Sequence, residues 1–246
     1  AGNGVSIYYD LVHLVHPLSQ HNGAKVLQLA RYDEIFLEEQ FGTDNGGPVF
    51  EMLMIRSETS TFCCGKEGPK LTNPYNDLGN EIEDLGDDKE DYRWQFLIKN
   101  QRSRDDYDAI IAMAKAFELS GTDLDEAIEQ TIDVDSWMRN VAFQSLIENR
   151  DVYSRGLKHN VMFYVRPSDQ KVMALPIDMD HIMTNSDAML HGYGNLGKIV
   201  DRPANLRLFY GHMHNFLTTS YNTSNMSPWI NHYGALAGQN FGGSLS

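Results

Sequence analysis

The chain has 246 residues, of which 41% are hydrophobic and 11% aromatic, enough to form one large domain or two small lobes that share a cleft. Its 34 Asp and Glu residues against 20 Lys and Arg give a formal net charge of −14. This charge argues against nucleic acid or an anionic membrane surface as the main partner, and it favours a basic peptide or metal ions unless it serves solubility alone. No apolar run approaches the length of a transmembrane helix, so no membrane insertion is expected. The two cysteines, Cys63 and Cys64, are adjacent and do not fit ordinary disulfide geometry.

The first part of the chain is predicted to be rich in β-strands. Strand-forming residues are dense over 5–16 and 25–29, and another strand is predicted over 49–55, after a tight Asn-Gly-Gly-Pro turn. A short amphipathic helix is predicted over 33–41. Its apolar side is expected to hold Ile35, Phe36, Leu37 and Phe41. The stretch 57–91 is polar and glycine-containing, which is typical of a solvated linker or a mobile lid.

The second part of the chain is predicted to be mainly helical. Helices are expected over 107–119, 123–130, 136–147 and 204–218. Candidate caps are Ser103 or Asp105 for the first of these helices and Asp133 or Asp135 for the third, and Gly121 is expected to end the first. The glycines at 192, 194 and 197 predict a flexible loop, and the chain after Trp229 is expected to fray.

Polar side chains flank a predicted β-hairpin, just before its first strand and just after its second. Strands are predicted over 161–165 and 171–175, joined by a turn over 166–170. Asn160 immediately precedes the first strand, and Asp178 and Asp180 follow the second. Pairing of the two strands would therefore place Asn160 and Asp178 side by side at the open end of the hairpin.

Asp151 reaches the same end from the preceding helix and loop. Hard oxygen ligands of this kind suit Mg²⁺, and a further carboxylate can orient or deprotonate a hydroxyl nucleophile. Any one of these residues alone would more often cap a helix or form a turn. The convergence of the group on one edge favours a metal and phosphate site.

Three stretches together resemble the CotH kinase family, the spore-coat protein H-like atypical protein kinases. The first joins Asp151, His159-Asn160 and the following aromatic-rich strand to Leu175-Pro-Ile-Asp178-Met-Asp180. The second is 28–42, which is similar to the family's segment where a strand passes into a helix. The third is Tyr92–Asn100 with the following Asp105–Asp108, which resembles the entry to the family's larger lobe. The resemblance covers most of the chain from about 23 to 217.

This resemblance implies a divergent bilobal protein kinase-like α+β fold. The small β-rich N-lobe would comprise residues 1–91, and the mainly helical C-lobe, with the metal-binding hairpin, residues 92–246. It implies transfer of the ATP γ-phosphate to Ser or Thr of a protein substrate with Mg²⁺ or Mn²⁺, at a secreted, cell-surface or spore-surface location. The charge balance favours a basic, Ser-rich substrate.

The resemblance also assigns roles to individual residues. Asp178, Asn160 and Asp180 would bind the metal, and Asp151 would accept or orient the substrate hydroxyl proton. Asn160 and Asp178 would thereby also hold ATP. Arg155 would meet phosphate oxygens, or else pair with a surplus carboxylate, and His159 would fix the backbone beside Asn160.

The sequence departs from the family pattern in the nucleotide half of the site. Ala30 and Glu51 stand where the family has a glutamate and a lysine, Ile177 stands where it has tryptophan, and the family's first strands would precede Val5. Lys25, Lys66 and Lys99 are candidates to replace the lysine. A catalytically inactive structural or adhesive member is therefore the alternative, and a metal-dependent phosphate-ester hydrolase is a third.

Overall fold

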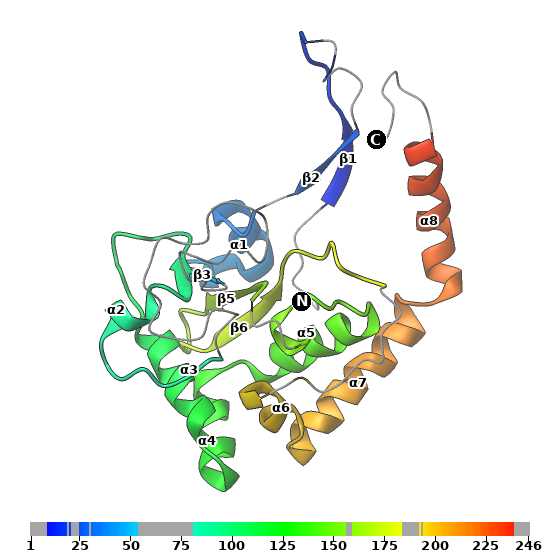
Figure 1. Ribbon diagram of the computed structural model, residues 1–246. Coiled ribbons are helices and arrows are strands. Elements are labelled where there is room, and N and C mark those ends of the chain that lie inside the picture. Colours follow the sequence, from blue (N-terminus) through cyan, green and yellow to red (C-terminus); the bar gives the residue numbers. More distant parts are fainter. Residues whose placement is uncertain are drawn as a thin grey trace, which may run out of the picture.

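The structure is a computed structural model, which describes residues 9–18, 20, 25–29, 31–53, 81–155, 159–183, 192 and 194–238. Predictions for Ala30, Cys63, Cys64 and Lys66 fall outside these residues. Within them the chain forms two small antiparallel sheets and a larger set of helices (Figure 1). The predicted α+β class is confirmed. Among the described helices, none is long and apolar enough to cross a membrane.

The central sheet has four antiparallel strands in the order β4-β3-β5-β6. These strands are β3 (Val49–Met52), β4 (Phe96–Ile98), β5 (Val161–Val165) and β6 (Val172–Pro176). The predicted hairpin is confirmed as β5 and β6, which pair from Val161↔Pro176 to Val165↔Val172. Because β3 pairs with both β4 and β5, one sheet joins strands from before and after residue 91. The division of the chain at that point stays a prediction.

Side chains alternate across this sheet, and each face is covered. Phe50, Phe96 and Phe163 lie on the face that packs on the helices of the second half of the chain, and these side chains are fully buried. Met162 and Tyr164, on the opposite face, pack against α1 (Glu34–Phe41). Burial on both faces explains why β5 and β6 read as continuous apolar runs rather than as alternating strands.

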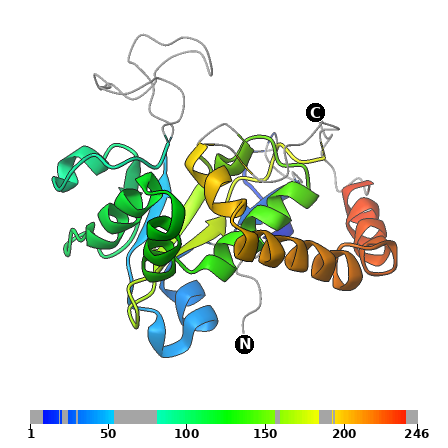
Figure 2. The same cartoon turned by 90° about the horizontal axis from the view of Figure 1, so that it is seen from below.

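The helical layer consists of five helices below the sheet as drawn in Figure 1 and facing the viewer in Figure 2. They are α3 (Asp108–Glu118), α4 (Gly121–Thr131), α5 (Val134–Leu146), α6 (Gly194–Val200) and α7 (Pro203–Thr219). Trp137 of α5 is at the centre: its ring stacks on Phe163 at 5.6 Å and meets Phe117 edge-on at 5.5 Å. Its indole N–H donates to the Val172 carbonyl at 2.9 Å. Phe117 and Trp137 therefore belong to the buried core.

Two elements project from this body in Figure 1. One is the ribbon of β1 (Tyr9–His13) and β2 (Lys25–Leu29), whose strands pair antiparallel. The other is α8 (Thr223–Gly238), which continues well past Trp229. The predicted fraying after that residue is therefore wrong up to Gly238.

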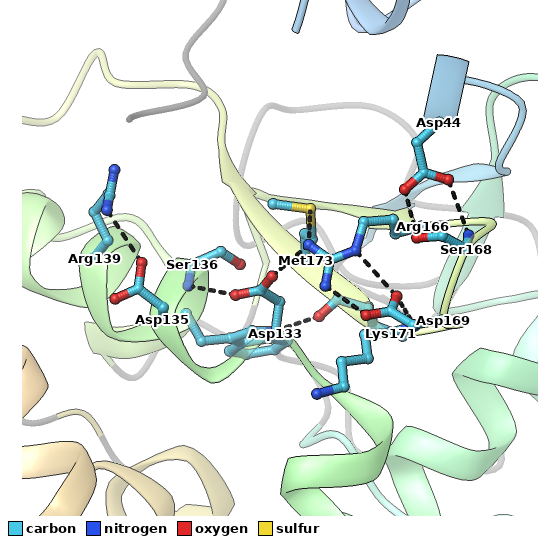
Figure 3. A network of polar contacts seen from close by, with 12 residues as sticks. Asp44, Asp133, Asp135, Ser136, Arg139, Arg166, Ser168, Asp169, Lys171 and Met173 are labelled. Carbon is cyan, nitrogen blue, oxygen red and sulfur yellow. Dashed lines mark hydrogen bonds and ion pairs between the residues drawn. The ribbon is translucent and has the colours of Figure 1, made fainter. Parts of the chain in front are cut away.

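The turn of the β5–β6 hairpin is bound to the start of α5 through Arg166 (Figure 3). The guanidinium contacts Asp133 and Asp169, each at 2.6 Å. Asp133 is the N-cap of α5, and its other oxygen accepts the Ser136 N–H at 3.0 Å, which confirms one of the two predicted caps. This contact links the hairpin to the helix whose far end leads to Asp151.

Several local predictions are corrected by packing. Asp105 does not cap α3, because its carboxylate contacts Lys89 and Arg93 instead, and the N-cap position belongs to Tyr107. Gly121 begins α4 with a left-handed φ of 62° rather than ending the helix before it. Ile35 is 72% exposed, so it is not part of the apolar side of α1.

Two segments expected to be loose are ordered. Within the acidic stretch, Glu81 and Ile82 are buried, and Tyr92, at the end of α2 (Lys89–Tyr92), accepts the Leu85 N–H and donates to the Gly86 carbonyl. A solvated linker is therefore wrong for Glu81 and Ile82, whereas residues 83–91 are ordered but mostly exposed. The loop predicted around residues 192–197 is instead the start of α6 from residue 194 onward.

Gly47 marks the closest approach of the β3 turn to the hairpin. A Cβ placed there would lie 1.7 Å from the Val165 carbonyl oxygen, whereas at Gly46 it would meet nothing within 4 Å. We therefore expect Gly47→Ala to lower the free energy of unfolding by about 1–3 kcal/mol, because the backbone must move apart. Gly46→Ala is the matched control and should change stability little. Urea unfolding followed by circular dichroism measures both, and equal effects would contradict this packing.

Candidate functional site

The open end of the hairpin faces a cavity of about 1300 Å³. Asn160, Asp178 and Asp180 lie on its wall together with Glu51 and Lys99 from the β3–β4 edge. The remaining wall is largely apolar and includes Leu27, Leu29, Phe143, Leu146, Met162, Ile177, Ile182, Phe216 and Met226. Arg31 and Arg102 also line it, so the cavity combines a carboxylate cluster, three cationic side chains and a broad apolar surface.

Asn160 and Asp178 flank the last paired positions of the hairpin. Val161 pairs with Pro176, so the two residues lie just outside the ladder. Both have left-handed backbones, with φ of 56° and 54° respectively. Asn and Asp tolerate this conformation better than most residues. The chain can therefore leave each strand sharply and keep both side chains at the same cavity.

Asp151 is held beside Asn160 of the cavity wall by three side chains. Asn149, which is fully buried, bonds to Gln144 of α5 and accepts the Asp151 N–H at 3.1 Å. One carboxylate oxygen of Asp151 lies 3.0 Å from Nε2 of His159. The Asn160 carboxamide donates to the Asp151 carbonyl at 2.8 Å and to the other carboxylate oxygen at 3.3 Å. This use of its nitrogen leaves the Asn160 carboxamide oxygen available for a cation.

The segment after β6 is fastened to the end of α5. The Arg150 N–H donates to the His181 carbonyl at 3.1 Å, and the Met183 N–H donates to the Ile147 carbonyl at 2.8 Å. These bonds bring Asp180 and His181 next to Asp151. One donor atom from each of these three side chains lies within 4.8 Å of the other two.

The electrostatics of the cluster are unfavourable without a cation. The pKa of Asp178 is raised above its usual value of 3.8, first by burial and then by the negative charges of Asp180 and Asp151. His159 and His181 oppose this shift. Crowded oxygen donors, among which the pKa of Asp178 is raised, match the donor set that a divalent cation requires. These residues therefore fit a bound Mg²⁺ or Mn²⁺.

Most of the predicted site residues meet at this cavity. Asn160, Asp178 and Asp180 line it, and Asp151 contacts Asn160 directly. Arg155 belongs to the short turn η3 (Tyr153–Arg155) and is not among the described residues of the cavity wall. Its contact with phosphate stays a prediction. His159 fixes the backbone as expected, since its carbonyl accepts the Tyr153 N–H at 2.7 Å.

Sequence reasoning missed two features of the site. The first is His181, which is adjacent to Asp180 and could have been included as a possible ligand on that basis. The second is the ion pair between Lys99 and Glu51, with Nζ and Oε2 2.5 Å apart. Lys99 was one of three candidate lysines, but nothing in the sequence connects it to Glu51, which is 48 residues away.

A family model described as CotH kinase protein matches residues 27–239. The chain belongs to the CotH kinase family. The match spans the hairpin, the carboxylate cluster and most of the helical layer, so it confirms the resemblance carried by the three sequence stretches. No curated protein matches the chain.

Proposed function

We propose that this CotH family member is an atypical protein kinase that transfers the γ-phosphate of ATP to Ser or Thr of a basic protein substrate. The observation that supports it best is the convergence of Asn160, Asp178 and Asp180 on one cavity that Lys99 also lines. Phosphoryl transfer depends on positioning and on neutralising phosphate charge, and this arrangement offers both. We also propose that the fold is bilobal and kinase-like.

Each site residue has a proposed role that follows from its chemistry. Asp178, Asn160 and Asp180 would hold Mg²⁺ or Mn²⁺, which when bound neutralises phosphate charge. Asp151, oriented by His159 and Asn160, would accept or orient the proton of the substrate hydroxyl. The apolar wall of the cavity would exclude water and cover the base of the nucleotide. The surplus of carboxylates fits a basic peptide rather than an acidic one.

Calorimetric titration with ATP in the presence of Mg²⁺ or Mn²⁺ tests the proposal, with EDTA as the metal-free control. We expect metal-dependent binding, followed by phosphate transfer to basic, Ser-rich peptides. Absence of ATP binding with either metal would contradict the proposal and support the catalytically inactive, structural or adhesive alternative. ATP consumption without a phosphorylated product would instead favour a hydrolase.

Lys99 would contact the phosphates, because it is the lysine on the described cavity wall. It follows β4, and its neighbour Asn100 fixes this end of the strand by accepting the Val49 N–H at 2.7 Å and donating to the Gly47 carbonyl at 3.1 Å. Its side chain is 36% exposed, lines the cavity and pairs with Glu51. This pair offers a cation and a partner carboxylate although Glu51 stands where the family has a lysine.

We expect Lys99→Met to weaken ATP binding about 10- to 100-fold, because it removes one charge-assisted contact to phosphate. Lys115→Met is the matched control, since Lys115 also pairs with a carboxylate, Asp87, but lies outside the cavity wall. Calorimetry with saturating Mg²⁺ measures both variants. An unchanged affinity in Lys99→Met would remove Lys99 from the proposed nucleotide site.

A further inference from the structure

We propose that His181 is a ligand of the metal ion in this site, and that the site therefore selects a first-row transition ion such as Mn²⁺ over Mg²⁺. This inference rests on the proposed function only in placing a cation at the carboxylate cluster. It adds a nitrogen donor to a ligand set that was predicted from the sequence to contain oxygen donors alone. The donors would be Asp151, Asp180 and His181, beside Asn160 and Asp178 on the cavity wall.

The spacing of the three donor atoms is close to what one ion requires. Opposite ligands of an octahedral ion lie about 4.2 Å apart when each metal–ligand distance is about 2.1 Å. The donors of Asp151, Asp180 and His181 already lie within 4.8 Å of one another. Small side-chain rotations would close the remaining gap, and neither Asp180 nor His181 is held back by burial, with side chains 67% and 62% exposed.

The backbone holds His181 in place although its side chain is exposed. Its carbonyl accepts the N–H of Arg150, the residue immediately before Asp151. The bond between the Met183 N–H and the Ile147 carbonyl fixes the chain again two residues later. The imidazole and the Asp151 carboxylate are thus carried on two segments that are hydrogen-bonded to each other, so only the side chains have to be ordered when the ion binds.

Ligand chemistry gives the selectivity. Mg²⁺ takes oxygen ligands almost exclusively and gives up its waters reluctantly, so an imidazole adds little to its affinity. First-row transition ions accept imidazole together with carboxylates. A Mg²⁺ ion would therefore be held by the oxygen donors alone, whereas Mn²⁺ would gain the nitrogen. The competing interpretation is a plain surface contact between His181 and Asp180, whose Nε2 and Oδ2 atoms are 3.8 Å apart.

Electron paramagnetic resonance of bound Mn²⁺ separates the two interpretations without any activity assay. The probe is Mn²⁺ alone, titrated into the full chain, with free Mn²⁺ quantified and electron spin-echo modulation used to detect a directly bound ¹⁴N. The variants are His181→Gln and, as matched control, His214→Gln, an exposed histidine on α7 outside the cavity wall. Mg²⁺ affinity is measured by competition.

We expect the wild type and His214→Gln to show the ¹⁴N modulation and His181→Gln to lose it. The Mn²⁺ affinity of His181→Gln should fall about tenfold or more, with a Mg²⁺ affinity changed less than about twofold. A modulation that persists in His181→Gln, a wild type without it, or no Mn²⁺ binding at all would each overturn the proposal. Nitrogen-coordinated Mn²⁺ without ATP binding would support the ligand assignment while contradicting the kinase function.

Discussion

Asp178→Asn should abolish metal-dependent ATP binding and lower phosphotransfer by at least about 10²- to 10³-fold. The substitution keeps the shape of the side chain and removes a negative charge that interacts with those of Asp151 and Asp180. Stabilisation of phosphate charge is the main contribution of such a site, and losing one well-placed electrostatic partner commonly costs this much. Asn also accepts the left-handed φ of 54° at this position, so the backbone is preserved.

The same substitution should stabilise the metal-free protein. The pKa of Asp178 is raised in the folded state, so the folded protein disfavours its charged form. The group therefore contributes most to stability below its ordinary pKa of 3.8, and that contribution is lost as the pH rises through the higher folded-state value. At neutral pH the charged carboxylate destabilises the metal-free folded state, and Asn removes that charge. Excess Mn²⁺ should reverse the order, since only the wild type binds the ion tightly.

Thermal unfolding in EDTA, at pH 7 and again near pH 4, checks this reasoning. Asp178→Asn should have the higher Tm at pH 7, and the difference should shrink at the lower pH. Asp169→Asn is a control of opposite sign: its contact with Arg166 lowers the pKa of Asp169, so that variant should be destabilised at pH 7. A lower Tm for metal-free Asp178→Asn would show that the carboxylates do not repel one another as described.

The fold was predictable where apolar residues leave one consistent pattern. The hairpin strands and the helix carrying Trp137 are found within a residue or two of their predicted bounds, since buried runs and an apolar stripe define them. The predictions from the sequence fail where polar residues bind distant partners. Asp105 is a residue type that often caps helices, yet its carboxylate forms ion pairs with Lys89 and Arg93. Local propensity carries no information on such contacts.

The site shows the same division. Asn160, Asp178 and Asp180 could be grouped from the sequence because strand pairing alone brings the two ends of a hairpin together. Lys99 and Glu51 could not, because their contact depends on β3 and β4 pairing across 48 residues. A sheet register of this kind follows from the whole packing arrangement rather than from either segment. Pairs joined in this way are found only once the fold is known.

Asp151→Asn should lower kcat by about 10²- to 10⁴-fold at saturating metal and ATP, the range typical of losing a general base. In the wild type, Nε2 of His159 lies 3.0 Å from one carboxylate oxygen of Asp151. The variant keeps an oxygen that can accept a hydrogen bond from His159. Folding should therefore be preserved. What is lost is the ability to take a proton from the substrate hydroxyl. Single-turnover phosphotransfer measures the step itself, and Asp123→Asn, an exposed acidic residue on α4, serves as the control.

Two roles compete for Asp151, and this variant separates them. As a base it would change kcat and leave Mn²⁺ affinity nearly intact, whereas as a ligand beside Asp180 and His181 it would also weaken Mn²⁺ binding. Both of its carboxylate oxygens already accept from neighbours, at 3.0 Å and 3.3 Å, and the longer of these contacts, to Asn160, is the one that a cation can replace. A loss of kcat that saturating Mn²⁺ restores would make Asp151 a metal ligand alone. A loss that persists at full Mn²⁺ occupancy would require Asp151 at the substrate proton.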